Sequence, residues 1–212
     1  MRFANRRDAG EQLTTKLEHL RGADPVVLGL PRGGVPIAAI VARRLRAQLD
    51  VIIVRKVGVP FHRELAMGAV GEEGAQVLES EVIAAARVKP EEVDRVVAEE
   101  QREVVRRAQR YREGRAPVSI AGRTAVIVDD GIATGSTARA AIQVARARGA
   151  ERVVLACPVA SVESAEELRA EVDEFVVVAT PRHFMAVGQF YEDFSATTDD
   201  EVTAALRGAT PA

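Results

Sequence analysis

Short apolar runs alternate with longer stretches of helical periodicity along most of the chain. Five of these runs are apolar at nearly every position, and polar or glycine-rich residues follow each of them. A strand that is apolar on both faces is typical of a parallel sheet covered by helices. The pattern therefore predicts strands near residues 26–30, 51–55, 125–129, 153–157 and 175–178.

The stretches between these runs have the spacing of amphipathic helices. Asp8 with Glu11, and Thr198 with Glu201, have the spacing of a helix N-terminal capping box. A long helix is expected from Pro90, and its acids come early and its arginines late, which suits the helix dipole. Further helices are expected over residues 37–49, 136–150 and 161–172.

This alternation of strand and helix predicts a doubly wound α/β sheet, mostly parallel, with right-handed crossovers. Residues 64–70 and 75–79 flank Gly-Glu-Glu-Gly and predict a hairpin, so one antiparallel edge strand is expected near residues 66–70. The chain shows no internal repeat or linker, so we expect one domain over residues 1–212 with its core at about 24–180. Ligands of such sheets bind at the carboxyl ends of the strands.

Composition and charge narrow the range of functions. The 212 residues are 47% hydrophobic and 28% charged, which is typical of a packed domain. A net charge of -2 gives no general reason to expect nucleic acid or an anionic membrane as a partner. The charged N-terminus lacks an apolar secretory segment, and no run has the roughly 18 apolar residues of a membrane span. We therefore expect a cytoplasmic protein.

The stretch "VIVDDGIATGST", residues 126–137, is the most informative part of the sequence. Asp129 and Asp130 follow a buried apolar run, where two carboxylates are costly without partners. Gly131 and Gly135 permit a tight turn, and the amides and hydroxyls that follow can bind a phosphate at the start of a helix. An ordinary glycine-rich turn is the alternative. A ligand that carries a phosphate together with sugar hydroxyls or a metal would explain why the acids adjoin a phosphate cradle.

This stretch resembles the phosphoribosyl pyrophosphate signature of the type I phosphoribosyltransferases. The resemblance implies that the two acids hold the ribose hydroxyls and help to stabilise an oxocarbenium-like ribose. It also implies that the Thr-Gly loop holds the 5′-phosphate. Contacts with ribose and 5′-phosphate are therefore expected from Asp129, Asp130, Gly131, Ile132, Ala133, Thr134, Gly135, Ser136 and Thr137.

Two further loops at strand ends carry basic residues. The resemblance places "LPRGGVP", residues 30–36, on the pyrophosphate, with a non-proline cis peptide bond at Arg32–Gly33. A basic residue of similar proteins also reaches pyrophosphate at the position of "VRKVGVP", residues 54–60. A plain turn and a solvated strand end are the alternatives. Pyrophosphate contacts are expected from Arg32, Gly33, Gly34, Arg55 and Lys56, and catalytic roles from Asp129, Asp130, Arg32 and Lys56.

The family carries its mobile catalytic loop in the region that corresponds to residues 57–118 here. Arginines late in the long helix are candidates to close over the pyrophosphate: Arg110, Arg112 and Arg115. The alternative is an exposed amphipathic helix whose arginines only complement its dipole.

Half of the eight aromatic residues of the chain lie within residues 184–194. The family binds its nucleophile under a variable hood, which we expect at residues 181–207, with or without the N-terminal helix. Phe184, Phe190 and Tyr191 are the candidates to stack on an acceptor ring. Alternatively, these rings only cover the open end of the sheet.

The resemblance implies transfer of ribose 5-phosphate from phosphoribosyl pyrophosphate to a nitrogen nucleophile, with release of pyrophosphate. It implies Mg²⁺ carried by the pyrophosphate, with Asp129 or Asp130 reached through water; we also expect a homodimer. Ala133 stands where 6-oxopurine-specific members have an acid, so hypoxanthine, guanine and xanthine are not the expected acceptors. A nucleotide or phosphoribosyl pyrophosphate sensor on the same fold, or a hydrolase that uses water, are the alternatives.

Overall fold

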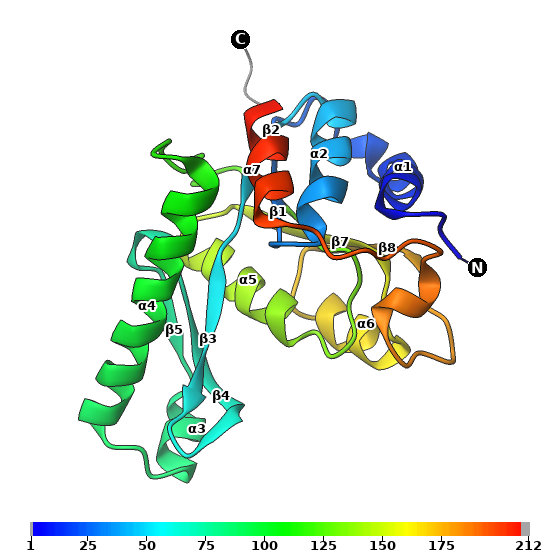
Figure 1. Cartoon of the computed structure of the whole chain (residues 1–212). Coiled ribbons are helices and arrows are strands. Elements are labelled where there is room, and N and C mark those ends of the chain that lie inside the picture. Colours follow the sequence, from blue (N-terminus) through cyan, green and yellow to red (C-terminus); the bar gives the residue numbers. More distant parts are fainter. Residues whose placement is uncertain (1, 209–212) are drawn as a thin grey trace.

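In the computed structural model, which describes residues 2–208, a five-stranded parallel sheet forms the centre of the molecule (Figure 1). Its strand order is β2-β1-β6-β7-β8, and every neighbouring pair is parallel. The strands are β1 (Val26–Gly29), β2 (Gln48–Val51), β6 (Thr124–Val128), β7 (Arg152–Val159) and β8 (Glu174–Ala179). The predicted α/β fold with a mostly parallel sheet is confirmed.

Helices cover both faces of this sheet (Figure 1). One face is covered by α1 (Arg6–Leu17), α2 (Gly34–Leu45) and α7 (Asp199–Gly208), and the other by α5 (Ser136–Ala147) and α6 (Val162–Arg169). The helices predicted for residues 37–49, 136–150 and 161–172 are confirmed, with bounds shifted by a few residues.

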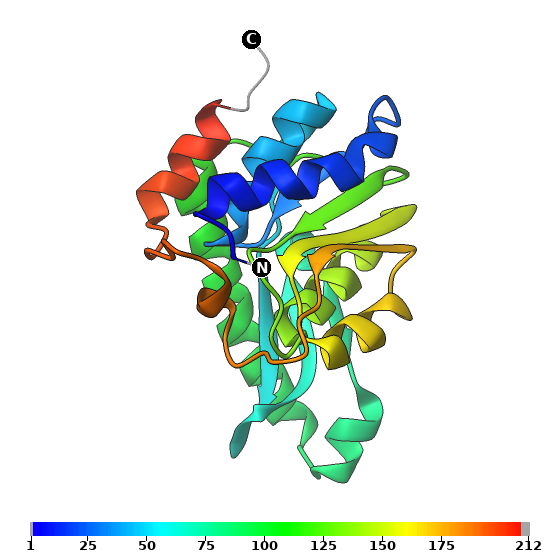
Figure 2. The ribbon, with the colours of Figure 1, turned by 90° about the vertical axis from the view of Figure 1, so that its right-hand side faces the viewer.

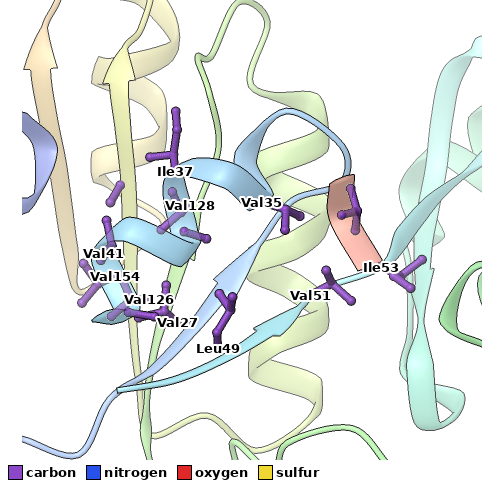
Figure 3. Packing of buried hydrophobic residues seen from close by; sticks show 14 of the residues in the cluster. Val27, Val35, Ile37, Val41, Leu49, Val51, Ile53, Val126, Val128 and Val154 are labelled. Carbon is purple, nitrogen blue, oxygen red and sulfur yellow. The ribbon is translucent and has the colours of Figure 1, made fainter. Parts of the chain in front are cut away.

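The apolar core lies between the sheet and these helices. Successive residues of a strand point to opposite faces of the sheet. Val27, Val126 and Val154 share a buried cluster with Ile37 and Val41 of α2 (Figure 3). The neighbouring strand residues belong to a second cluster beneath α5 and α6. Because both faces are packed, the strand ends that carry the candidate loops are held in a fixed arrangement.

The second predicted strand is wrong in its bounds. The parallel strand β2 ends at Val51, and residues 54–59 start a separate antiparallel sheet of order β3-β4-β5. Its strands are β3 (Val54–Val59), β4 (His62–Gly71) and β5 (Gln76–Leu78). The apolar run continues across the break between the two sheets, so apolar periodicity alone cannot locate that break.

The predicted hairpin is confirmed as the antiparallel pair β4 and β5. The strand expected near residues 66–70 lies within β4, but it belongs to the small sheet and not to an edge of the parallel sheet. The long helix predicted from Pro90 is α4 (Pro90–Arg112), which packs along β3. Together with α3 (Ser80–Ala85), these elements extend beyond the parallel sheet as an arm (Figures 1 and 2).

Helix α1 begins three residues earlier than Asp8 would place it. The side chain of Asn5 accepts hydrogen bonds from the N–H groups of Arg7 and Asp8, so Asn5 is the N-terminal cap. At the start of α7 the predicted box forms, because Thr198 and Glu201 exchange side-chain to backbone bonds of 2.7 and 3.2 Å. Within residues 2–208, no helix combines the length and the apolar character that a membrane crossing needs.

Candidate functional site

The loops that follow β1 and β6 meet at the carboxyl end of the sheet. The N–H of Leu30 donates to the carbonyl of Val128 across 2.9 Å. A Cβ atom at Gly33 would lie 1.9 Å from Oδ2 of Asp130, and one at Gly34 would lie 2.3 Å from the carbonyl oxygen of Val128. Only glycine therefore fits at both positions, and the two motifs found in the sequence form one site.

The cis peptide bond of the first loop was predicted one residue too late. It lies between Pro31 and Arg32, whereas Arg32–Gly33 was expected. Gly33, on the other side of Arg32, has helical backbone angles as the cap of α2.

The second loop forms a cavity of about 200 Å³ at the start of α5. Gly135 has a left-handed φ of 71°, and the helix begins at Ser136. The N–H groups of a first helical turn have no partner within the helix, so those of α5 are available to an anion. The cavity is lined by Asp129, Gly131, Ile132, Ala133, Thr134, Gly135, Ser136, Thr137, Ala138 and Val187.

Neighbouring elements fix the shape of this loop. The hydroxyls of Ser161 and Ser164, at the start of α6, both donate to the carbonyl of Ala133, at 2.9 and 2.7 Å. Val187 lies against Gly131, where a Cβ atom would be 2.4 Å from its Cγ1. Sequence reasoning missed these three residues, because each lies far along the chain from the loop that it supports.

Lys56 joins the phosphate loop from the small sheet. Its Nζ lies 3.3 Å from Oγ of Ser136, so the basic residue of β3 and the hydroxyl of α5 can contact the same anion. Arg55 turns the other way and pairs with Glu100 of α4 at 2.7 Å. Both basic residues line a cleft of about 570 Å³ between β3 and α4. Lys56 thus lies beside the loop at the start of α5 and does not line the cavity next to Arg32, so its contact with pyrophosphate stays a prediction, whereas Arg55 faces the arm.

A second, cationic cavity of about 340 Å³ separates the first loop from α4 and α7. Arg110 lines it and pairs with Asp199 at 3.0 Å, and its contact with pyrophosphate stays a prediction. Arg106 and Arg107 share Glu103, and these two hydrogen bonds lower the pKa of that carboxyl to about 2. The cavity is lined by Pro31, Arg32, Arg106, Arg107, Arg110, Tyr111 and Asp199.

The expectation that Arg112 closes over the pyrophosphate is wrong. Its side chain is only 4% exposed and bonds to Asp50, Glu72 and the carbonyl of Val51. Arg112 follows Arg110 by two residues, which is a rotation of about 200° around the helix. Arg112 therefore faces the core. Arg115 lies past the helix end and donates to the carbonyls of Arg112 and Leu206, away from the residues that line the cationic cavity.

The two acids at the end of β6 have unequal surroundings. Asp129 lines the phosphate cavity, and the N–H of Asp130 donates to its Oδ1 at 2.8 Å. Burial, together with the adjacent charge of Asp130, raises the pKa of Asp129 to about 8. Burial also raises the pKa of Asp130, but Arg6 opposes that rise with contacts of 2.9 and 2.8 Å to Oδ2.

The segment predicted as the hood, residues 181–207, packs partly on the start of the chain. Phe3 exchanges backbone hydrogen bonds with Phe190 and Glu192, so these two stretches lie together. The ring of Tyr191 packs between Phe3 and Phe194, and its hydroxyl donates to the carbonyl of Asp130 at 2.6 Å.

The three predicted hood aromatics differ in exposure. Tyr191 is 1% exposed and Phe190 9%, so Tyr191 offers no open ring face for stacking and Phe190 offers little. Phe184 is half-buried and packs on Phe190 with ring centroids 5.1 Å apart. Of the three, Phe184 has the most open ring. Stacking on an acceptor stays a prediction that rests chiefly on this residue.

Comparisons with known proteins agree with this geometry. Residues 5–194 match the model of the phosphoribosyl transferase domain family. Two proteins from strains of Mycobacterium tuberculosis, provisionally named phosphoribosyl transferases, are 52% identical over 204 residues, which is 96% of this chain and 46% of each of theirs. The chain thus spans about half the length of the curated relatives it matches.

Solved structures agree as well. The crystal structure of a protein from Thermus thermophilus is 45% identical and covers 100% of both chains, with a TM-score of 0.90. A protein from Aquifex aeolicus, 11% identical with a TM-score of 0.51 over 86% of this chain and 78% of its own, shares the fold alone. With a family model that spans 190 residues from Asn5 to Phe194, the chain belongs to the phosphoribosyl transferase domain family.

Proposed function

We propose that this chain transfers ribose 5-phosphate from phosphoribosyl pyrophosphate to a nitrogen nucleophile and releases pyrophosphate. The observation that carries the proposal is a single cavity whose wall holds both Asp129 and the phosphate cradle of residues 131–137. A phosphate bound in the cradle places the attached sugar beside the acid. A carboxylate in the same cavity would repel a phosphate, so a site for phosphate alone would bind more tightly without it.

The 5′-phosphate end of the donor is held by groups of three kinds. The free N–H groups of the first turn of α5 supply hydrogen bonds and the positive end of the helix dipole. Thr134, Ser136 and Thr137 add hydroxyls, and Lys56 adds a positive charge next to Ser136. Lys56 reaches the loop from the small antiparallel sheet and contributes as a point charge, because its ammonium group is compact and its stem is flexible.

The cationic cavity beside Arg32 suits the pyrophosphate end of the donor. Four arginines line it, and two carboxylates, Glu103 and Asp199, pair with the three that come from α4. The excess of positive charge favours a polyanion. Gly33 and Gly34 allow the backbone of the same loop to lie close to Asp130 and Val128, which brings the sugar acids near the pyrophosphate end.

The reaction itself breaks the bond between C1′ and the pyrophosphate oxygen and forms a bond from C1′ to the acceptor nitrogen. Positive charge develops on the ribose as the leaving group departs, and carboxylates fixed beside the ring stabilise it. Within residues 2–208, no group of three or more His, Cys, Asp or Glu side chains could hold a metal. Two carboxylates suit Mg²⁺ that arrives on the pyrophosphate and keeps its waters. Such an ion would neutralise part of the charge of the leaving group.

The acceptor is not expected to be a 6-oxopurine. Ala133 provides no carboxylate, and its carbonyl is already bonded to Ser161 and Ser164. A hydrogen bond to a charged group contributes about 1.5–3 kcal/mol, so its absence lowers the preference for these bases by about tenfold or more. The ratio of kcat/KM values across purine and pyrimidine bases measures this preference. Efficient transfer to guanine or hypoxanthine would contradict it.

A screen of pyrophosphate release tests the proposed function. The protein is supplied with phosphoribosyl pyrophosphate and Mg²⁺, with and without a panel of purines, pyrimidines and amines. Release that depends on an acceptor is expected, and the double variant Asp129→Asn with Asp130→Asn should abolish it. Release without any acceptor would indicate a hydrolase, and tight donor binding without release would indicate a sensor.

A further inference from the structure

The first turn of α1 places an arginine on the acid pair. Arg6 contacts Oδ2 of Asp130 through Nε and a terminal nitrogen, at 2.9 and 2.8 Å. Its other terminal nitrogen donates to the carbonyl of Ser195 at 2.7 Å, and its guanidinium lies 4.1 Å from the centre of the Phe194 ring. The side chains of Arg6 and Asp130 are each 14% exposed.

These contacts hold Arg6 in one position. A long side chain loses rotamer freedom when it is fixed, and hydrogen bonds to two partners, Asp130 and Ser195, with a cation–π contact offset that loss. The next residue, Arg7, shows the ordinary situation on the same helix. Its side chain is 83% exposed and pairs with Glu11 at 3.5 Å. The difference between two adjacent arginines points to a specific role for Arg6.

We propose that Arg6 is a positioning residue for the donor ribose, because it holds the carboxylate of Asp130 in the orientation that the sugar hydroxyls meet. The inference rests on the proposed function, and it adds a residue that none of the recognised motifs contains. Arg6 does not touch the reacting atoms in this account. It acts through Asp130, and it connects the N-terminal helix and the hood to the donor site.

The surroundings of Asp130 support this role. Oδ2 lies between Arg6 and Gly33, where a Cβ atom would be only 1.9 Å away. The carbonyl of the same residue accepts the hydroxyl of Tyr191 at 2.6 Å. Arg6 therefore fixes the side chain of Asp130, and Tyr191 fixes its main chain. A carboxylate that is ordered before the ligand arrives binds it with less loss of entropy.

The charges around the pair show why an arginine is needed. From the elements packed on the acids, the titratable groups are Arg6 of α1, Tyr191 of the hood and Cys157 of β7. Burial raises the pKa of both Tyr191 and Cys157, so these two stay neutral near pH 7.

Arg6 is thus the positive charge that offsets the two carboxyls, and it lowers the pKa of each of them. Two further carboxyls lie within reach of its charge. Hydrogen bonds from Ser195 lower the pKa of Asp193 and hydrogen bonds from Thr198 lower that of Glu201, and the charge of Arg6 adds a smaller lowering to both. Without Arg6, the two acids would hold their protons to higher pH and accept hydrogen bonds from hydroxyls less well.

Equilibrium titrations with ribose 5-phosphate and with inorganic phosphate test the inference. Inorganic phosphate reports on the cradle alone, whereas ribose 5-phosphate also needs the acids. We expect Arg6→Ala to lower the affinity for ribose 5-phosphate by about tenfold while the affinity for inorganic phosphate is unchanged. The matched control Arg7→Ala should change neither. Arg6→Lys keeps a charge but not the two-nitrogen contact, and should fold normally and lose affinity to a smaller extent.

A pH series separates positioning from a general effect on folding. Binding of ribose 5-phosphate should reach half of its maximum at a higher pH in Arg6→Ala than in the unmodified protein. Added guanidinium ion at low millimolar concentration should restore part of the affinity. If Arg6→Ala and Arg6→Lys keep the ribose-to-phosphate affinity ratio and the pH profile of Arg7→Ala, the inference is wrong. If the unmodified protein binds ribose 5-phosphate no tighter than phosphate, the proposed function fails, and the role of Arg6 fails with it.

Discussion

Two clusters in this molecule have the same composition, one arginine and two carboxylates, but they are satisfied differently. Where α4 meets β2, Arg112 bonds to both Asp50 and Glu72. At the proposed donor site, Arg6 bonds to Asp130. Asp129 lies beside that pair at the phosphate cavity, and its pKa is raised to about 8.

The first cluster is closed in the sense that its hydrogen-bonding groups are used within the protein. Asp50 also accepts the N–H groups of Val51 and Val118, and Arg112 also donates to the carbonyl of Val51. No hydrogen-bonding group of this cluster is left for a ligand. Its role is structural, because it joins α4 of the arm to β2 of the parallel sheet. In the second cluster, burial and the charge of Asp130 outweigh the contacts that favour the charged form of Asp129. An acid with a strongly perturbed pKa beside a cavity is typical of a functional site, where the ligand supplies the missing contacts.

The largest expected effect comes from breaking the closed cluster. Arg112→Ala leaves two buried carboxylates without their partner, and breaking such a pair costs about 3–5 kcal/mol of unfolding free energy. Denaturant unfolding measures the loss. Arg106→Ala is the matched control, since its pair with Glu103 is exposed and screened by solvent and should contribute little. Equal losses in the two variants would show that the first cluster is not closed.

The second cluster, Arg6 with Asp129 and Asp130, is called the open cluster. Neutralising one of its acids should raise the unfolding free energy, whereas breaking the closed cluster lowers it. An acid with a pKa near 4 when unfolded and about 8 when folded costs no stability below pH 4, and the cost grows as the pH rises toward 8. Asp129→Asn removes that cost. We expect the variant to match the unmodified protein below pH 4 and to exceed it at pH 8.5 by at least about 1.4 kcal/mol, the equivalent of one pKa unit. A variant that is less stable at both pH values would contradict the raised pKa.

Displacing Asp130 from Arg6 should affect the sugar but not the phosphate. Gly33→Ala adds a methyl group at the point where Oδ2 of Asp130 lies, so the carboxylate must move. The affinity for ribose 5-phosphate should fall by about tenfold, as expected for one charged hydrogen bond, with inorganic phosphate unaffected. Gly208→Ala is the control, because a Cβ atom there meets nothing within 4 Å. Unchanged ribose affinity in Gly33→Ala would show that this orientation of Asp130 is unimportant.

The smallest effect concerns the cradle. Lys56 is exposed and contacts Ser136 at 3.3 Å, so its charge is screened by solvent. Lys56→Ala should weaken inorganic phosphate and ribose 5-phosphate by the same factor, a few-fold at most. Calorimetric titration gives both constants. A selective loss of ribose 5-phosphate would assign Lys56 to the sugar acids and remove the distinction between cradle and open cluster.

Contiguous features were predictable from the sequence, and features that join distant segments were not. The strand, acid pair and phosphate loop of residues 125–137 follow one another in the chain, so their order alone indicates the site. Arg6 and Asp130 are 124 positions apart, and no local pattern connects them. The side chain of Arg112 was misassigned because composition cannot tell which face of α4 it occupies.

The same distinction applies to the fold. Periodicity located the parallel strands at residues 125–129 and 153–157 well, because each is a separate apolar run between polar residues. It misplaced β2, since residues 51–54 remain apolar while the chain passes from one sheet to the other. The cap of α1 was also misplaced, because Asn5 and Asp8 both suit a helix start and only the observed hydrogen bonds distinguish them.

The central claim is that the open cluster and the cradle together bind the donor. Calorimetric titration with phosphoribosyl pyrophosphate in the presence of Mg²⁺, compared with inorganic phosphate, tests it most directly. The unmodified protein should bind the donor at least about tenfold more tightly, and Asp129→Asn with Asp130→Asn should lose that advantage while still binding phosphate. Equal affinities for the donor and for phosphate in the unmodified protein, or an advantage that survives in the double variant, would contradict the account.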